Sequence, residues 1–344
     1  MARAEADRGQ AVWIAIIAII LIAAAAFIAS SVIAPLALAL FIIAMVWPVQ
    51  RTLERTMPKL VALALTILGT IAVCLLFAYL VGWGFGRVGR ALIADAARYQ
   101  AIYDEFVRWL EGHGISVAGV WAENFNVAWM LRTAQHVTGR LNTTVMFWVI
   151  AFVYVMLGLL EVDDMSRKVN ALKNREAARI IAQGCISVAA KIRRYMWVRT
   201  QMSLMTGLFV WLFAWAVGLQ FAAEWGVIAF ALNYIPFIGP FIATFFPSAL
   251  AILQFGSWQA AVGIFICLNI IQFVIGSYLE PRIAGNALSL SPTLVLFAVF
   301  LGAFIWGLFG AFIGVPIAIA IIAFCEQHSS TRWIAEILGA PPEA

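Results

Sequence analysis

Eight long apolar runs divide the sequence and restrict the folds that the chain can adopt. A helix needs about 20 apolar residues to cross a bilayer, and most of the runs have that length. With 64% hydrophobic and only 11% charged residues, the chain carries too much apolar surface for a soluble core. We therefore predict an all-α, polytopic membrane protein that forms a single domain over residues 1–344. The runs lie at 11–29, 31–47, 60–83, 144–160, 203–223, 225–253, 258–279 and 293–325.

Two of these runs, 225–253 and 293–325, are too long for one simple span, and both contain Gly and Pro. In the first, Pro236 and Pro240 remove amide donors and should break the helix. Unpaired backbone carbonyls survive at membrane depth only against protein or a water-filled cavity. We expect each run to be a broken, kinked helix or a re-entrant hairpin, and the freed carbonyls could hold a solute or an ion.

Basic residues set the predicted orientation, because short loops rich in Lys and Arg stay in the cytoplasm. The segment 161–199 carries nine Lys and Arg residues and is predicted to be a basic amphipathic linker on the cytoplasmic face. The segment 84–142 balances its six Arg residues with acidic ones and is predicted to be an external amphipathic insert. Such helices usually lie at the membrane interface, as anchors or as a cap and a lever. Both termini are then cytoplasmic, in what we expect to be a bacterial inner membrane.

Motifs for enzyme chemistry are absent from the sequence. His113, His136 and His328 lack metal-binding spacing, and no nucleotide-binding glycine loop or nucleophile motif occurs. The four cysteines also show no metal spacing. We expect no enzyme activity, no cofactor, no metal and no nucleic-acid partner, so that any uphill transport must use an ion gradient.

Polar residues inside the apolar runs are costly in lipid, which makes them candidates for a transport path. Asn269, Gln272 and Glu280 are spaced so that a regular α-helix would place them on one face. A structural role stays open, in which the amides bond to neighbouring helices and Glu280 pairs with Arg282. Gly310 and Gly314 form a GxxxG pair and, with Pro316, are predicted to serve hinging or packing. The predicted substrate or ion path comprises Asn233, Pro236, Gly239, Pro240, Thr244, Asn269, Gln272 and Glu280.

Three stretches of the chain resemble the autoinducer-2 exporter (AI-2E) family of bacterial permease-like proteins. They are LNYIPFIGPFIATFFP at 232–247, LEPRIAGNALSLSPTLVL at 279–296 and FGAFIGVPIAIA at 309–320. The resemblance implies a helical exporter of small molecules that is coupled to an ion and forms a homo-oligomer, such as a pentamer. It also implies functional positions at Asn233, Pro236, Gly239, Pro240, Glu280, Pro281 and Pro316.

The favoured hypothesis is a secondary transporter that exports a small solute or signalling molecule across the lipid bilayer. A proton or sodium gradient would drive it, and Glu280 is the candidate for coupling. Three alternatives stay open: a passive channel or pore, a sodium–proton antiporter, and a scaffold whose amphipathic segments bind partners.

Overall fold

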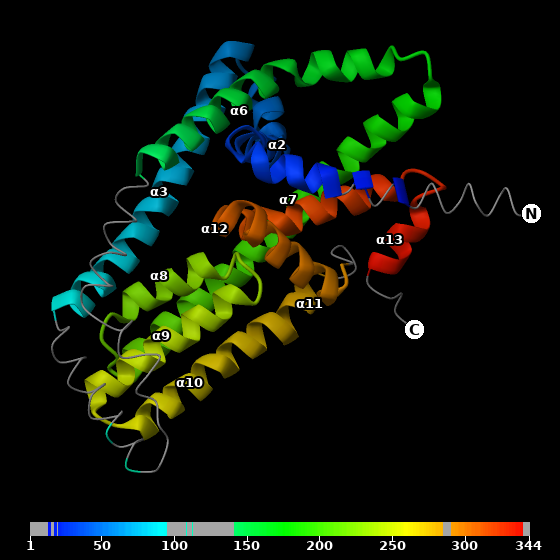
Figure 1. The fold of residues 1–344 in the computed structure, drawn as a ribbon. Coiled ribbons are helices and arrows are strands. Elements are labelled where there is room, and N and C mark those ends of the chain that lie inside the picture. The colour runs from blue at the N-terminus through cyan, green and yellow to red at the C-terminus, as the bar shows by residue number, and fades with distance from the viewer. Residues whose placement is uncertain are drawn as a thin grey trace, which may run out of the picture. The chain divides into compact units, whose positions relative to one another are not determined.

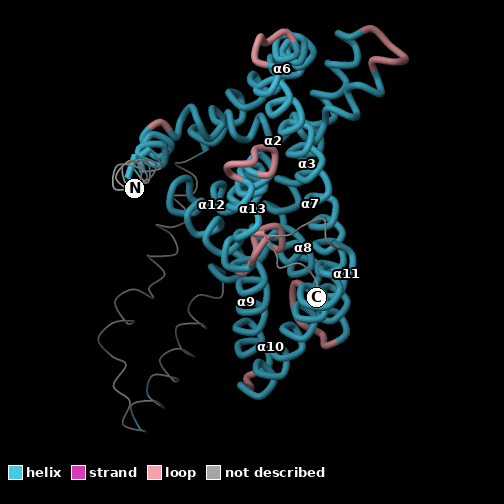
Figure 2. The backbone as a smooth tube through the Cα atoms, turned by 90° about the vertical axis from the view of Figure 1, so that its right-hand side faces the viewer, coloured by secondary structure: helices cyan, strands magenta, loops and turns pink. Residues whose placement is uncertain are grey.

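The fold of the chain is helical. A computed structural model describes Trp13, Ile14, Ile17, Ala18, 20–94, Arg108, Gly112, 141–284 and 290–339. Within these residues the chain forms helices and turns, with one backbone bridge between Leu290 and Gly339 (Figure 2). The prediction of an all-α, polytopic membrane protein is confirmed. Most of the external insert predicted at 84–142 lies outside the described residues, so its role stays a prediction.

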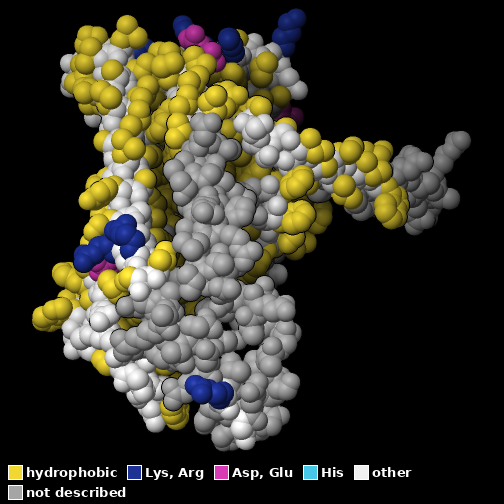
Figure 3. Space-filling model, turned by 60° about the vertical axis from the view of Figure 1, so that its left-hand side comes forward, with side chains coloured by type: hydrophobic (Ala, Val, Ile, Leu, Met, Phe, Trp, Pro, Cys, Tyr) yellow, Lys and Arg dark blue, Asp and Glu magenta, His cyan; other side chains and the backbone are white. Residues whose placement is uncertain are grey.

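Five of the helices are long and apolar enough to cross a membrane: Ser30–Leu53, Lys59–Ala94, Val145–Asn170, Trp258–Ile283 and Pro292–Cys325. Hydrophobic side chains cover much of the described surface in Figure 3, as expected for helices that face lipid. In chain order the elements are α2 (Ser30–Leu53), α3 (Lys59–Ala94), α6 (Leu141–Asn170), α7 (Arg175–Ala216), α8 (Ala222–Leu232), α9 (Ile238–Phe255), α10 (Trp258–Phe273), a π-helix (Val274–Leu279), α11 (Glu280–Ala284), α12 (Pro292–Cys325) and α13 (Arg332–Leu338) (Figure 1).

The chain divides into two compact units, which we describe one at a time. The first unit comprises 1–67, 147–194 and 287–344, and the second comprises 68–146 and 195–286. Helix α7 begins in the first unit and ends in the second, and the division falls after Arg194.

In the first unit, apolar side chains of α2, the start of α3 and α6 form one core. Leu38, Ile42, Leu63, Val155 and Leu159 belong to it and are buried. The first half of α7 contacts the end of α12 in the same unit, because the Lys191 ammonium lies 2.6 Å from the Glu326 carboxylate.

Helix α12 is a hairpin rather than one straight span. Trp306 and Gly307 leave helical geometry, and Gly307 has φ 65° and ψ −144°, a conformation that is essentially restricted to glycine. A Cβ added at Gly302 would overlap the Gly310 carbonyl, and one added at Gly314 would overlap the Ala298 carbonyl. The contacting positions 302 and 310, and likewise 298 and 314, lie at equal distances in sequence on either side of Trp306. The two arms of α12 are therefore antiparallel and touch through their backbones.

The second unit contains the other overlong run, which forms two helices joined by a turn. Helices α8 and α9 lie side by side, and α9 also packs along α10 (Figure 1). The 11 residues of α8 extend only about 16 Å, roughly half of a bilayer core. We call α8 and α9 the first hairpin and the two arms of α12 the second hairpin. The prediction of broken or re-entrant segments at 225–253 and 293–325 is therefore confirmed in the fold.

The first hairpin is held closely against α7. A Cβ added at Gly207 of α7 would lie 2.8 Å from the Gly226 carbonyl of α8, and the reverse contact is equally close. Glycines permit such an approach because they have no side chain, and close backbone packing substitutes in lipid for the missing hydrophobic drive.

Polar contacts fasten the open end of the first hairpin, where α8 begins and α9 ends. The Gln254 side chain accepts a hydrogen bond from the Gln220 amide at 2.8 Å and donates one to the Gly218 carbonyl at 2.7 Å. The Glu224 carboxylate, which is buried in the first turn of α8, lies 2.8 Å from the Arg87 guanidinium of α3. This end of the hairpin is therefore tied to both α3 and the loop after α7.

Candidate functional site

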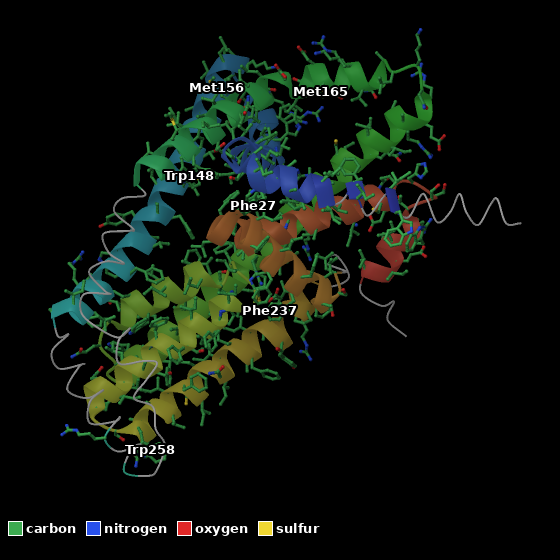
Figure 4. All side chains as sticks on the ribbon, viewed as in Figure 1. Phe27, Trp148, Met156, Met165, Phe237 and Trp258 are labelled. Atoms are coloured by element: carbon green, nitrogen blue, oxygen red, sulfur yellow. The ribbon has the colours of Figure 1, made fainter. Side chains whose placement is uncertain are left out.

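The break between α8 and α9 is the centre of the candidate site. Asn233 caps α8, and Phe237, which is labelled in Figure 4, follows in the turn before α9. Phe237 has φ 64° and ψ −52°, which is the conformation of a γ-turn. The Ile238 amide closes that turn by donating to the Pro236 carbonyl at 2.7 Å. A γ-turn with positive φ is rare and strained in L-residues, and strain of this kind gathers at functional sites.

Gly239 and Pro240 begin α9 immediately after the turn. A Cβ added at Gly239 would overlap the Leu232 carbonyl, so only glycine lets the chain fold back this tightly. The buried Thr244 hydroxyl lies 3.1 Å from the Pro240 carbonyl, to which it donates. The Ile235 carbonyl accepts a bond from the Gly239 amide at 3.0 Å.

Side chains, rather than free carbonyls, therefore supply much of the polar chemistry at the break. The sequence predicted carbonyls without helical partners around Pro236 and Pro240. The Pro236 carbonyl is instead bonded within the γ-turn, and Ile235 and Leu232 accept from Gly239 and Ile235. A strained turn can satisfy the same backbone groups that a proline releases from a helix.

One face of α7 supplies polar partners for the break. Tyr195, Arg199, Ser203 and Thr206 recur at helical spacing, and all four are buried. The Asn233 amide donates to the Ser203 hydroxyl at 3.3 Å. On the next turn of α7, the Thr200 hydroxyl accepts a bond from the Tyr234 hydroxyl at 3.0 Å.

Glu280 completes the cluster through an ion pair. Both of its carboxylate oxygens lie 2.9 Å from Nη1 of Arg199. The Arg199 side chain is 10% exposed and that of Glu280 is 25% exposed, so the cation is the more deeply buried partner. Removing an ion pair from water costs free energy unless its geometry is good. Charged residues inside a membrane are therefore rare, and this pair marks a candidate functional site.

A π-helix changes the spacing expected for the polar residues of 258–279. The segment Val274–Leu279 is a π-helix, so residues after it are rotated relative to a regular α-helix. The expectation that Asn269, Gln272 and Glu280 share one face is wrong for this reason. Asn269 is exposed and donates to the Phe265 carbonyl at 2.8 Å, whereas Glu280 faces Arg199.

Gln272 is neither exposed like Asn269 nor paired with α7 like Glu280. It is half buried, and its Nε2 has no hydrogen-bond partner among the described residues. The pairing of Glu280 with Arg282 that the sequence left open does not form in the structure. The Arg282 guanidinium lies over the Tyr278 ring instead, 4.0 Å from its centroid.

The structure thus brings Asn233, Pro236, Gly239, Pro240 and Thr244 together in the first hairpin. Glu280 joins Asn233 through neighbouring turns of α7. Gly310, Gly314 and Pro316 belong to the first unit, where all three are buried in the second arm of α12. Pro316 does not break that arm, because the break lies at Gly307.

Sequence reasoning missed the residues that α7 contributes. Arg199 is the last basic residue of the linker 161–199, and Ser203 begins the apolar run 203–223, so neither residue stands out by its type. The available signal was the spacing of Tyr195, Arg199 and Ser203 at steps of four. Within the described part of the chain, no group of three or more His, Cys, Asp or Glu side chains could hold a metal.

The pattern of the AI-2E family transporter matches residues 15–330, which is most of the chain. The chain is 31% identical over 319 residues to the "AI-2 transport protein TqsA" of Escherichia coli (strain K12), covering 90% of each protein. This chain belongs to the AI-2E transporter family. It is also 25% identical over 343 residues, 94% of each chain, to a "Putative transport protein" of Haemophilus influenzae. The two hairpins described above are therefore part of a membrane transport protein of the AI-2E family.

Proposed function

We propose that this AI-2E protein is a secondary transporter that exports a small solute or signalling molecule. The carrying observation is the Arg199–Glu280 ion pair, which lies on the same face of α7 as the partner of Asn233 at the helix break. Burying polar and charged side chains in a membrane protein costs free energy. Such residues are therefore rare and usually mark a functional site. Their gathering at a broken helix is typical of a transport site.

In this proposal the first hairpin forms one wall of the site and α7 the other. Asn233 and Ser203 would contact the solute directly, whereas Gly239 lets the hairpin fold back beside them. Glu280 would couple transport to a proton or sodium gradient, since it is the carboxylate of the cluster that remains partly exposed. Thr244 and Gln272 would extend the path along α9 and α10.

Orientation and assembly are part of the same proposal. Both termini, and the start of α7, would lie in the cytoplasm of a bacterial inner membrane, as the basic segment 161–199 indicates. A single cysteine placed at Glu176, in a cysteine-free background, should react with an impermeant reagent only after the cell is opened. A homo-oligomer, such as a pentamer, is expected in detergent.

The experiment is a flux assay in liposomes with the purified protein and an imposed proton or sodium gradient. Glu280→Gln should abolish gradient-driven transport, because the neutral amide cannot release a proton or hold a cation. Glu336→Gln is a matched control, since Glu336 forms an exposed pair with Arg332 and is 68% exposed. Undiminished coupled flux in Glu280→Gln would remove Glu280 from the mechanism.

The alternatives give different results in the same assay. A passive channel or pore would show flux that needs no coupling and exceeds the rate of a conformational cycle. A sodium–proton antiporter would exchange the two ions without any organic solute. The "AI-2 transport" in the name of the Escherichia coli relative makes a small polar signalling molecule the first solute to test.

A further inference from the structure

The Arg199–Glu280 pair is unequal in its two partners. Arg199 lies in the middle of α7, a continuous helix of 42 residues, and its side chain is 10% exposed. Glu280 directly follows the π-helix, opens the five-residue α11 and is 25% exposed. The cation is therefore fixed by its helix, whereas the carboxylate sits on the accessible side of the pair.

The guanidinium still has hydrogen-bonding capacity. Both oxygens of Glu280 lie 2.9 Å from the same nitrogen, Nη1, and Nε of Arg199 is buried without a hydrogen-bond partner among the described residues. A guanidinium offers five N–H donors in a planar fork that matches a carboxylate through two parallel bonds. Glu280 contacts only one nitrogen of that fork, so the pair lacks the two parallel N–H···O bonds that a guanidinium can form with a carboxylate.

We propose that Arg199 is the recognition residue for a carboxylate on the transported solute, and that Glu280 occupies the guanidinium until that carboxylate displaces it. The inference rests on the proposed transport function and adds a chemical class to its substrate. Glu280 itself demonstrates that a carboxylate fits against Arg199. The hydroxyl groups of Thr200, Ser203 and Tyr234 nearby could accept or donate bonds to hydroxyls on the same solute.

Displacement has a defined charge balance. Glu280 leaves the guanidinium and takes one proton from water, while the carboxylate of the solute becomes the new partner of Arg199. No covalent bond is made or broken apart from this proton uptake, and the net charge of the site stays the same. The buried Tyr195 side chain lies beside Arg199 at the pair, whereas Arg282, two residues after Glu280, lies over the Tyr278 ring. Binding of one monocarboxylate is therefore accompanied by the uptake of one proton at Glu280, with no change in the net charge of the site.

The test exploits a gain of binding, which a merely structural ion pair would not give. In Glu280→Gln the internal carboxylate is gone, so purified full-length protein should bind lactate at least tenfold more tightly than the unmodified protein. Isothermal titration calorimetry measures this directly. Lactamide, the uncharged counterpart of lactate, should bind to neither form. The double variant Arg199→Gln, Glu280→Gln should lose the gain because the guanidinium is absent.

Glu326→Gln is a matched control, because it leaves Lys191 without its partner in the other unit. An equal gain in this variant would mean that any unpaired cation attracts lactate, and the proposal would fall. It would also fall if Glu280→Gln bound lactate no better than the unmodified protein, or bound inorganic phosphate as tightly as lactate. If Glu280→Gln does not fold, Glu280→Ala should show the same gain in lactate affinity over the unmodified protein. An unchanged affinity there would overturn the proposal.

Flux and binding separate this inference from the proposed function. If the unmodified protein shows gradient-driven transport but Glu280→Gln gains no lactate affinity, carboxylate recognition is refuted and the transport function stands. A lactate gain in a protein that moves no solute in liposomes would refute transport and retain the binding site.

Discussion

The Asn233 amide donates to the Ser203 hydroxyl across 3.3 Å, and this bond joins the break between α8 and α9 to α7. Both residues are buried, at 6% and 0% exposed. The bond connects positions 30 residues apart and holds the strained turn in a fixed place against a long helix. Its energetic contribution can be measured because each partner can be truncated alone.

Asn233→Ala and Ser203→Ala should each lower stability by about 1 kcal/mol, since each leaves a buried polar group without its partner. The double variant should lose less than the sum, with a coupling energy of about 0.5–1.5 kcal/mol. Thermal unfolding in detergent provides the four values of this cycle. Strict additivity would show that the two side chains do not interact in solution.

Phe237→Gly should stabilise the fold, because glycine adopts positive φ without the strain that a side chain imposes. Relief of about 1–3 kcal/mol of strain is offset by the greater entropy loss of glycine, about 0.5–1 kcal/mol. Phe241→Gly is the matched control, since Phe241 is also exposed but lies in helix α9. There glycine should destabilise by about 1 kcal/mol. Equal losses in both variants would contradict a strained turn.

Gly239→Ala should disrupt the first hairpin, because the new methyl group would overlap the Leu232 carbonyl. A backbone atom cannot move aside as a flexible side chain can, so we expect a loss of about 1–3 kcal/mol or more. Gly263→Ala on α10 has no atom within 4 Å of the new methyl group and should be neutral or slightly stabilising. The comparison needs only the two midpoints of thermal unfolding.

Arg87→Ala should destabilise the open end of the first hairpin, because it leaves the buried Glu224 carboxylate unpaired. We expect about 1–3 kcal/mol, below the cost of breaking a fully buried pair, since Arg87 is half exposed. Adding Glu224→Gln should restore much of the loss by removing the buried charge. If the double variant is no more stable than Arg87→Ala, Glu224 carries no charge penalty.

The sequence was sufficient to predict the places where local chemistry decides the structure. Pro236, Gly239 and Pro240 required a break in run 225–253, and the turn lies among them. In run 293–325 the glycines mattered more than the proline, since the break falls at Gly307 and Pro316 stays within a helical arm. Both outcomes follow from backbone rules that act over a few residues.

Features that depend on distant contacts could not be predicted in this way. Arg199 and Glu280 are 81 residues apart, and neither residue alone indicates its partner. The positive φ of Phe237 is set by the closure of the hairpin rather than by the preference of phenylalanine. Pro281 follows the π-helix by two residues but does not by itself specify a wide turn, so the constant helical step assumed for this run did not hold.

The π-helix decides where along this helix a residue can be lost. Such a segment holds one residue more than a regular helix requires, so deletion of Gly276 should let it close as an ordinary α-helix. Glu280 would then keep its direction toward Arg199, and coupled flux should survive. Deletion of Gly263, in the regular part of α10, should instead turn the residues that follow by about 100° and separate Glu280 from Arg199, although every ionisable group is still present. The helix should therefore tolerate a shorter length only where it already holds a surplus residue.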